Sequence, residues 1–190
     1  MSNQPRCQQC AGLMPALARS HAKFCSGRCR VAAHRQRQVN PNLPAELTRR
    51  ARWVNNSWAK VPFQPSGKAA SVSDPSTWST YRQVAASERK GFVLNGDGIV
   101  CIDLDHCLVD GCPTPEVARI LSSLPPTYVE VSPSGTGLHI WGRGSVERGR
   151  RTAVAEVYGT GRYITVTGRA FNDAPKVLAD ISRTVESLLA

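Results

Sequence analysis

Two carboxylates stand two residues apart in the middle of the chain, at Asp103 and Asp105. The residues before them, 99–102, are Ile-Val-Cys-Ile, an apolar run typical of a strand covered on both faces. Because side chains two apart in a strand project to the same side, both carboxylates should point at one spot. Two such anions repel each other unless a cation lies between them, and Mg²⁺ or Mn²⁺ suits hard oxygen ligands. The alternative is that both residues simply face water in a strand-to-loop turn.

Two more ionisable residues interrupt strands that are otherwise apolar. His139 and Glu156 each lie between two apolar neighbours. Either one alone is more often a satisfied polar residue or part of a wet sheet face. If both share a face with the aspartate pair, however, three carboxylates can hold two divalent ions beside a histidine, as in phosphoryl transfer. The turn at 132–137, Ser-Pro-Ser-Gly-Thr-Gly, could offer N–H groups and hydroxyls to phosphate oxygens, although hairpins need such residues anyway.

Two close pairs of cysteines lie near the N-terminus, spaced C-x2-C-x14-C-x3-C: Cys7, Cys10, Cys25 and Cys29. Two thiolate pairs at this separation can surround a tetrahedral Zn²⁺, with His21 and His34 as substitute ligands. So short a stretch has too little apolar surface to fold without the metal. The alternative is a set of unpaired reduced thiols. Seven cysteines, an odd number without a secretory context, favour a reducing cytoplasm.

The formal net charge of +10 is concentrated near the N-terminus. Residues 1–52 hold ten Lys and Arg residues against one acidic residue, whereas the rest of the chain holds 14 basic and 13 acidic ones. Ser26 is expected to cap a helix after the second cysteine pair. That helix carries four guanidinium groups, those of Arg28, Arg30, Arg35 and Arg37. We therefore predict a nucleic-acid-binding helix, against the alternative of a merely solvated face.

The linker-like residues 40–44 divide the chain into two predicted domains, a zinc-binding basic module at 1–40 and a catalytic domain at 41–190. Residues 53–63 are expected to form a strand closed by a turn at Lys60-x-Pro62. Three hairpins should follow, with turns at 95–98, 132–137 and 159–161. Helices are predicted over 115–124 and after Pro175. The expected fold class is α+β.

Several of these motifs, taken in order, resemble the archaeo-eukaryotic primase superfamily. They are Asp-Leu-Asp, then Ser-Pro-Ser-Gly-Thr-Gly-Leu-His, then Glu-Val-Tyr followed by Gly-Arg-Tyr-Ile-Thr-Val-Thr-Gly. The chain is most similar to the primase-polymerase domains encoded by phages and plasmids. Upstream, Arg-Trp-Val at 52–54, Lys-Val-Pro at 60–62 and Ser-Thr-Trp-Ser-Thr-Tyr at 76–81 look like the same group. The resemblance spans roughly residues 50–170.

This resemblance implies an RRM-like sheet with flanking helices, joined to a second α/β unit. It also implies roles for seven side chains, with metal binding by Asp103, Asp105 and Glu156 and nucleotide contact by His139, Ser134, Lys60 and Arg162. The implied activity is template-directed nucleotidyl transfer by a two-metal mechanism, with single-stranded DNA and nucleoside triphosphates as partners. Replicative relatives commonly continue into a helical accessory region and a helicase. We therefore expect polymerisation more than de novo priming here, with a separate helicase as a candidate partner.

Two other functions remain open at this point. A metal-dependent nuclease or phosphoesterase would use the same acids without needing a triphosphate. A non-catalytic zinc-finger protein would bind DNA through residues 1–52 alone. The sequence contains no long apolar run and no signal peptide, so neither a membrane span nor export is expected. The expected location is the cytoplasm of a bacterial host cell.

Overall fold

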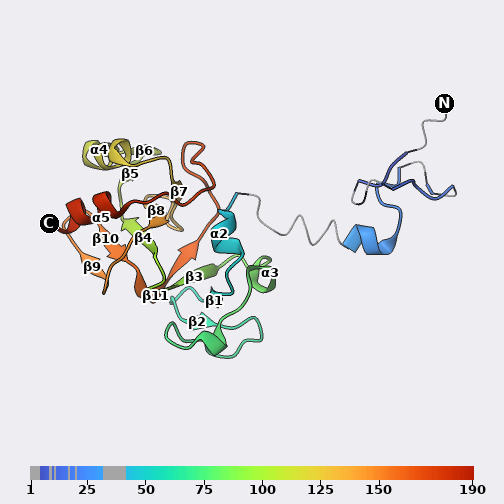
Figure 1. The fold of residues 1–190 in the computed structure, drawn as a ribbon, viewed down its shortest axis with the longest axis horizontal. Helices are drawn as coiled ribbons and strands as arrows, with labels where there is room; N and C mark the ends of the chain where they lie inside the picture. Colours follow the sequence, from blue (N-terminus) through green and yellow to red (C-terminus); the bar gives the residue numbers. More distant parts are fainter. Residues whose placement is uncertain (1–4, 9, 11, 17, 20, 32–41) are drawn as a thin grey trace. The chain divides into compact units, whose positions relative to one another are not determined.

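A computed structural model of the chain describes residues 5–8, 10, 12–16, 18, 19, 21–31 and 42–190. Contacts divide the chain into two compact units, Met1–Pro41 and Asn42–Ala190, which Figure 1 traces in blue and in the remaining colours. The predicted boundary lay between residues 40 and 41. Within the described residues, no helix combines the length and the apolar character needed to cross a membrane.

Two antiparallel sheets form the framework of the larger unit (Figure 1). The four-stranded sheet consists of β1 (Trp53–Asn56), β2 (Pro62–Phe63), β3 (Lys90–Asn95) and β11 (Thr160–Val166), in the order β11-β3-β1-β2. The five-stranded sheet consists of β4 (Ile99–Leu104), β7 (Tyr128–Val131), β8 (Leu138–Arg143), β9 (Arg150–Arg151) and β10 (Glu156–Tyr158), in the order β7-β8-β4-β10-β9. A small hairpin pairs β5 (Leu108–Val109) with β6 (Cys112–Pro113).

Short helices accompany these sheets. They are α2 (Ala45–Thr48), the 3₁₀ helix η1 (Pro75–Thr77), α3 (Tyr81–Val84), α4 (Pro115–Ser123) and α5 (Ser182–Leu189). The helix predicted over 115–124 is confirmed. The C-terminal helix begins at Ser182, later than expected, because residues 175–181 form a non-helical segment whose backbone bonds to Thr127, Tyr128 and Arg143 beside the five-stranded sheet. The α+β class is confirmed.

Strand β4 at the centre of the five-stranded sheet is buried on both faces, as the apolar run at 99–102 predicted. Val100, Ile102 and Leu104 face a cluster that includes Val117 of α4 and Val185 of α5. The alternate residues of β4 face a second cluster, shared with Trp53, Phe92 and Ile164 of the four-stranded sheet. The two sheets meet where the rings of Phe92 and Trp141 stack edge to face at 5.9 Å. Asp103 belongs to the face of β4 that is turned toward the four-stranded sheet.

Two of the three predicted hairpins are wrong. The turn at 95–98 connects β3 to β4, but β3 pairs with β1 and β11 whereas β4 pairs with β8 and β10. The turn at 159–161 likewise carries the chain from β10 back to β11 in the other sheet. Both transitions lie side by side, joined by a hydrogen bond of 2.9 Å from the Gly96 N–H to the Gly159 carbonyl. Turn residues specify where a chain reverses, not which strand it then pairs with.

The other two turns agree better with expectation. The turn at 132–137 joins β7 and β8, which pair directly and form the predicted hairpin. Residues 53–63 form a second hairpin, because β2 turns back and pairs antiparallel with β1, Phe63 opposite Asn55. The reversal is made at Lys60, whose φ of 57° lies in the left-handed region.

Candidate functional site

A row of polar side chains crosses the five-stranded sheet from one edge to the other. The strand register pairs Glu130 with His139, His139 with Asp103, Asp103 with Glu156, and Glu156 with Arg151. Directly opposed residues share one face of a sheet, so all five side chains project toward the same side. The neighbouring row on that face, two residues earlier along β4, is apolar and consists of Tyr128, Trp141, Cys101 and Tyr158. The polar row therefore begins where the core between the sheets ends.

Asp103 lies at the centre of this row with an unsatisfied oxygen. Its side chain is 19% exposed, and its Oδ1 atom is buried without a hydrogen-bond partner, 3.6 Å from Nε2 of His139. Burial raises the pKa of Asp103 above its usual value, and His139 opposes this shift while Asp105 and Glu156 add to it. A buried carboxylate oxygen without a donor is a favourable position for a cation. Asp103 could therefore offer one oxygen ligand to a divalent ion at this point, and a complete coordination shell would need further ligands.

His139 is held from behind by Glu130, a residue that sequence reasoning did not single out. Nδ1 of His139 lies 3.3 Å from Oε1 of Glu130, while its Nε2 faces Asp103. Burial lowers the pKa of His139, but the hydrogen bond and negative charge of Glu130, with further help from Asp103, raise it overall. This arrangement favours an imidazolium that turns an N–H toward the Asp103 side.

Glu130 itself is fully buried and accepts hydrogen bonds at both oxygens. Oε1 also accepts from the Trp141 indole at 3.3 Å, and Oε2 accepts from the backbone N–H of Gly168 at 2.8 Å and of Thr167 at 3.1 Å. The Tyr128 hydroxyl donates to Oε2 as well, at 3.2 Å. Glu130 thus ties β7, β8 and the turn after β11 together. An acidic residue in an alternating strand usually marks the wet face, and only its shared alternation with Tyr128 pointed inward.

Glu156 stands beside Asp103 in the row, but its carboxylate is already occupied. Its Oε1 lies 3.2 Å from Nε of Arg151, and the hydroxyl of Tyr158 donates to Oε2. Burial and this hydrogen bond raise the pKa of Tyr158 to about 12. The guanidinium of Arg162 stacks over the Tyr158 ring at 4.3 Å. Glu156 does not line the cavity described next, and its metal-binding role stays a prediction.

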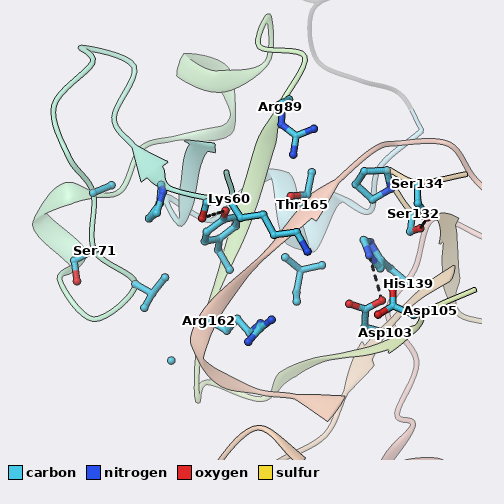
Figure 2. Close-up of a pocket in the computed structure, with 17 residues that line it drawn as sticks. Lys60, Ser71, Arg89, Asp103, Asp105, Ser132, Ser134, His139, Arg162 and Thr165 are labelled. Carbon is cyan, nitrogen blue, oxygen red and sulfur yellow. Dashed lines mark hydrogen bonds and ion pairs between the residues drawn. The ribbon is translucent and has the colours of Figure 1, made fainter. Parts of the chain in front are cut away.

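A cavity of about 670 Å³ opens between the two sheets in front of Asp103 (Figure 2). It is lined by six of the seven side chains for which the sequence implied metal or nucleotide contact: Lys60, Asp103, Asp105, Ser134, His139 and Arg162. Figure 2 shows the acids and His139 on one side, with Arg89, Arg162 and the start of the Lys60 side chain on the other. The five-stranded sheet thus contributes an anionic wall, and the four-stranded sheet with its β1–β2 turn contributes a cationic wall.

The β7–β8 turn packs closely against the end of β4 and brings Ser134 to the cavity. A Cβ on Gly137 would lie 2.7 Å from the Leu104 carbonyl, so only glycine lets the turn approach the aspartates so closely. The hydroxyls of Ser132 and Ser134 lie 2.9 Å apart, and that of Thr136 lies 3.2 Å beyond Ser134. A short chain of hydroxyl groups therefore borders the anionic wall.

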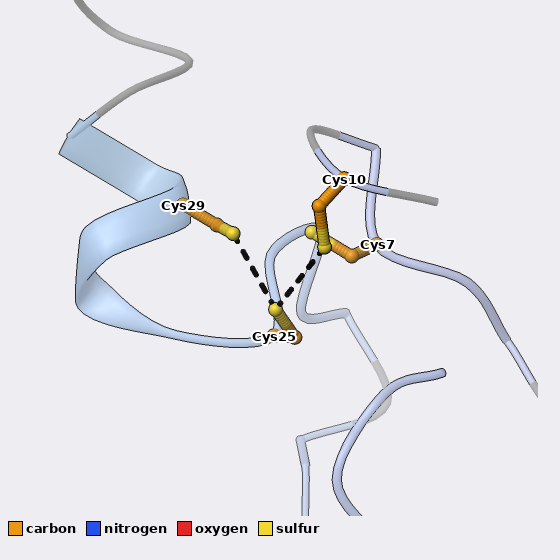
Figure 3. Close-up of side chains that lie close together, drawn as sticks. All are labelled: Cys7, Cys10, Cys25 and Cys29. Carbon is orange, nitrogen blue, oxygen red and sulfur yellow. Dashed lines mark hydrogen bonds between the residues drawn. The ribbon is translucent and has the colours of Figure 1, made fainter. Parts of the chain in front are cut away.

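The four N-terminal cysteines form a second candidate site, in the smaller unit (Figure 3). Their sulfur atoms all lie within 4.8 Å of one another, with Cys25 3.7 Å from Cys10 and 3.5 Å from Cys29. Sulfur atoms about 2.3 Å from a tetrahedral Zn²⁺ would lie about 3.8 Å apart. The Cys25 thiol shares hydrogen bonds with the sulfur atoms of Cys29, to which it donates, and of Cys10 and Cys7, and these bonds to its protonated form raise the pKa of Cys25 to about 12. The residues fit a zinc ion.

The basic helix begins as expected but is described only in part. The Ser26 hydroxyl accepts the backbone N–H of Cys29 at 3.1 Å and caps a helix seen over 27–31, which confirms the predicted cap. Arg28 and Arg30 are exposed on it. Three further residues of the sequence analysis, His34, Arg35 and Arg37, lie outside the described residues.

Comparison with known proteins finds similarity to a phage protein. No family model matches the chain. The chain is 36% identical to a protein named DNA primase-polymerase from Nitratiruptor phage NrS-1, over 66% of this chain. It spans 20% of the length of that relative. The similarity therefore relates 66% of this chain to one part of a longer phage protein.

Proposed function

We propose that this chain, similar to part of a phage DNA primase-polymerase, carries out template-directed nucleotidyl transfer in phage or plasmid DNA replication. One observation carries the proposal, namely a cavity between two sheets with carboxylates on one wall and cations on the other. A triphosphate accompanied by divalent ions needs both, because its oxygens bind cations while its ions bind carboxylates. We also propose that the core of the larger unit has an RRM-like fold.

In this proposal Asp103 and Asp105 hold Mg²⁺ or Mn²⁺, with Glu156 as a third acid. The bound ions would lower the pKa of the attacking hydroxyl and neutralise the triphosphate. Glu156 can join them only by exchanging its contact with Arg151. Losing the contact costs little free energy, because the Arg151 side chain is 80% exposed and water can take the place of the Glu156 carboxylate beside it.

The other lining residues bind and orient the triphosphate. Lys60 and Arg162 meet its phosphates from the cationic wall, and the Ser134 hydroxyl donates to them from the turn. The Nε2–H group of His139 donates a hydrogen bond to a phosphate oxygen. Glu130 keeps the ring in one orientation by its contact with Nδ1. Together these groups place the α-phosphate next to the aspartates, where the new bond forms and pyrophosphate leaves.

The smaller unit is proposed to hold a structural Zn²⁺ at its four cysteines and to bind single-stranded DNA through the basic helix. Arg28 and Arg30 contribute from the described residues, and Arg35 and Arg37 complete the proposed set. Acting in replication, the chain would work in the cytoplasm of a bacterial host cell, with a separate helicase as its candidate partner.

Primer extension on a DNA template, with Mg²⁺ or Mn²⁺, tests the proposal. Asp103→Asn should reduce incorporation by about 1,000-fold, equivalent to about 4 kcal/mol of transition-state stabilisation. Asp110→Asn is the matched control, because Asp110 is an exposed acid in the next hairpin and does not line the cavity. It should leave the rate unchanged.

Three results would contradict the proposal. The first is no primer extension and no dinucleotide synthesis with either metal. The second is cleavage of nucleic acid in the absence of nucleotides, which would indicate a nuclease using the same acids. The third is DNA binding without any reaction that is lost when zinc is removed, as expected for a non-catalytic zinc-finger protein.

A further inference from the structure

Trp58 is exposed to an unusual degree. Its side chain is 87% exposed, the highest value among the large apolar residues of the described part of the chain. The other three tryptophans behave differently, since Trp53 and Trp141 are fully buried and the Trp78 indole donates to the Ser71 carbonyl at 2.7 Å. An indole left in water forgoes a large hydrophobic gain, so its position calls for an explanation.

One face of the Trp58 ring is covered by an arginine that also lines the cavity. The guanidinium of Arg89 lies 4.3 Å from the ring centroid, and Arg89 forms part of the cationic wall. The Nε atom of Arg89 is buried without a hydrogen-bond partner. Because Trp58 remains largely exposed with Arg89 in place, its second ring face is open. The pair, which we call the Trp58–Arg89 shelf, is continuous with the cavity through Arg89.

The turn that carries this shelf is held firmly. Ser57 and Val61 bond to each other twice, through the Ser57 N–H to the Val61 carbonyl at 3.0 Å and the Val61 N–H to the Ser57 hydroxyl at 3.2 Å. The Tyr163 hydroxyl of β11 donates to the Lys60 carbonyl at 2.7 Å and pins the turn to the four-stranded sheet. A platform ordered in advance loses less entropy when a ligand stacks on it.

We propose that the Trp58–Arg89 shelf stacks an unpaired base of single-stranded DNA beside the cavity. The inference rests on the proposed function and adds to it where the strand being copied is held. An open indole face accepts any base, whereas a duplex has no free base face in its interior to offer. The Arg89 guanidinium has no carboxylate partner within the part of the chain that the structure describes, so it is available to the phosphates on either side of that base. The shelf therefore recognises a single strand without reading its sequence.

Tryptophan fluorescence of the full-length chain, titrated with oligo-dT in the absence of nucleotide and divalent ions, tests the shelf directly. Stacking should quench the emission of Trp58, and the Trp58→Phe variant identifies that signal, because Trp53 and Trp141 are fully buried and Trp78 is partly buried. Trp58→Phe should remove the quenching while keeping most of the affinity. Trp58→Ala should weaken oligo-dT binding by about 10-fold, measured by anisotropy of a labelled strand, without changing the salt dependence.

Arg89 and a control residue complete the design. Arg89→Ala should weaken binding and lower the slope of log affinity against log salt by about one. Val109→Ala is the control, since Val109 is 64% exposed on β5 and does not line the cavity. It should bind oligo-dT as the unaltered chain does. Both Trp58 variants should melt normally, because an exposed side chain supports little of the core.

The proposal is overturned if oligo-dT leaves the fluorescence unchanged, or if Trp58→Ala binds as tightly as Val109→Ala. It is also overturned if a blunt duplex quenches the Trp58 emission as strongly as a single strand does. A quenching of Trp58 by a protein partner and by no nucleic acid would overturn it as well. The measurement needs no catalysis, so a chain that stacks the strand without polymerising would refute the proposed function alone. A chain that polymerises and shows no stacking would refute the shelf alone.

Discussion

The four cysteines and the row of acids are both candidate metal sites, but the chain completes only one of them by itself. At the cysteines, four sulfur atoms lie within 4.8 Å of one another. Among the described residues no other group of three or more His, Cys, Asp or Glu side chains is gathered in this way. At the acids, Asp103 presents one unsatisfied oxygen while Glu156 is held by Arg151.

This difference matches two purposes of metal binding. A site closed by protein ligands serves structure, and a site with open positions leaves room for a substrate. The surroundings agree with that division. Among the described residues of Met1–Pro41 only Cys7 and Met14 are buried apolar side chains, whereas the larger unit has two hydrophobic clusters. We therefore expect the stability of the smaller unit to depend on a bound metal, and that of the larger unit to depend on its two hydrophobic clusters.

The largest expected effect on stability follows from removing one cysteine of the four-cysteine site. Cys25→Ser should abolish binding of one zinc per chain and unfold residues 1–41, because structural zinc contributes about 10 kcal/mol or more to such small units. The melting temperature of residues 42–190 should stay unchanged. Released zinc can be counted with a chromogenic chelator, and hydrogen exchange locates the unfolding.

Cys112→Ser is the control for this experiment, since Cys112 is an exposed thiol outside the cluster. It should keep the zinc and the exchange pattern. The comparison between the two sites fails if Cys25→Ser retains zinc at full affinity, or if it melts the larger unit as well.

A smaller effect is expected at Glu130, the acid of the polar row whose two oxygens both accept hydrogen bonds. Glu130→Ala should lower the free energy of unfolding by about 3–5 kcal/mol, because it leaves His139 and the donors of Trp141 and Gly168 buried without a partner. Urea denaturation measures this loss. Glu116→Ala in the exposed first turn of α4 should change stability by less than about 0.5 kcal/mol. Equal effects of the two substitutions would contradict the assigned burial role.

The smallest effect is expected at Asp103 and has the opposite sign. Without divalent ions, Asp103→Asn should stabilise the chain at neutral pH by about 1 kcal/mol, because it removes a buried charge with an unsatisfied oxygen. Thermal melting can measure this gain, with Asp110→Asn as the control that changes nothing. Added Mn²⁺ should stabilise the unaltered chain and not the variant.

The pH dependence of that gain has a defined direction. The folded-state pKa of Asp103 lies above its ordinary value of 3.8, so the folded chain binds more protons than the unfolded chain between these two values. Stability of the unaltered chain therefore falls as pH rises through that interval. The advantage of Asp103→Asn should be complete above it and vanish below 3.8. If Asp103→Asn is instead less stable than the unaltered chain at neutral pH, the Asp103 carboxylate is satisfied within the protein and the site has no open position for a cation.

Much of the two candidate sites could be predicted because short sequence patterns indicate their residues. The apolar run at 99–102 predicts a buried strand, and β4 with Asp103 near its end is that strand. Asp105 lies in the exposed turn after β4 and not in the strand, yet both aspartates line the cavity. Cysteine spacing alone predicts the four-sulfur cluster, which the structure confirms as a cluster. In each case a few neighbouring residues and a fixed backbone period suffice.

The rest depended on contacts between residues far apart in the chain. Glu130 appears in the sequence as an ordinary acid of an alternating strand, yet it is fully buried because Thr167 and Gly168, 37 and 38 residues later, supply its donors. Trp58 reads as one more strand aromatic, yet it is exposed at 87%. No local pattern distinguishes these outcomes.

By itself, the sequence determined which four cysteines cluster, which two aspartates line the cavity, the α+β class and the position of most chain reversals, since all of these follow from residue type and short-range periodicity. Only the tertiary structure decided that the turns after β3 and β10 pass the chain between two sheets instead of closing hairpins. That choice places Lys60, Arg89 and Arg162 opposite Asp103 and Asp105 across one cavity. Strand pairing is selected by the burial of whole faces, a property of the assembled sheets that no single turn contains.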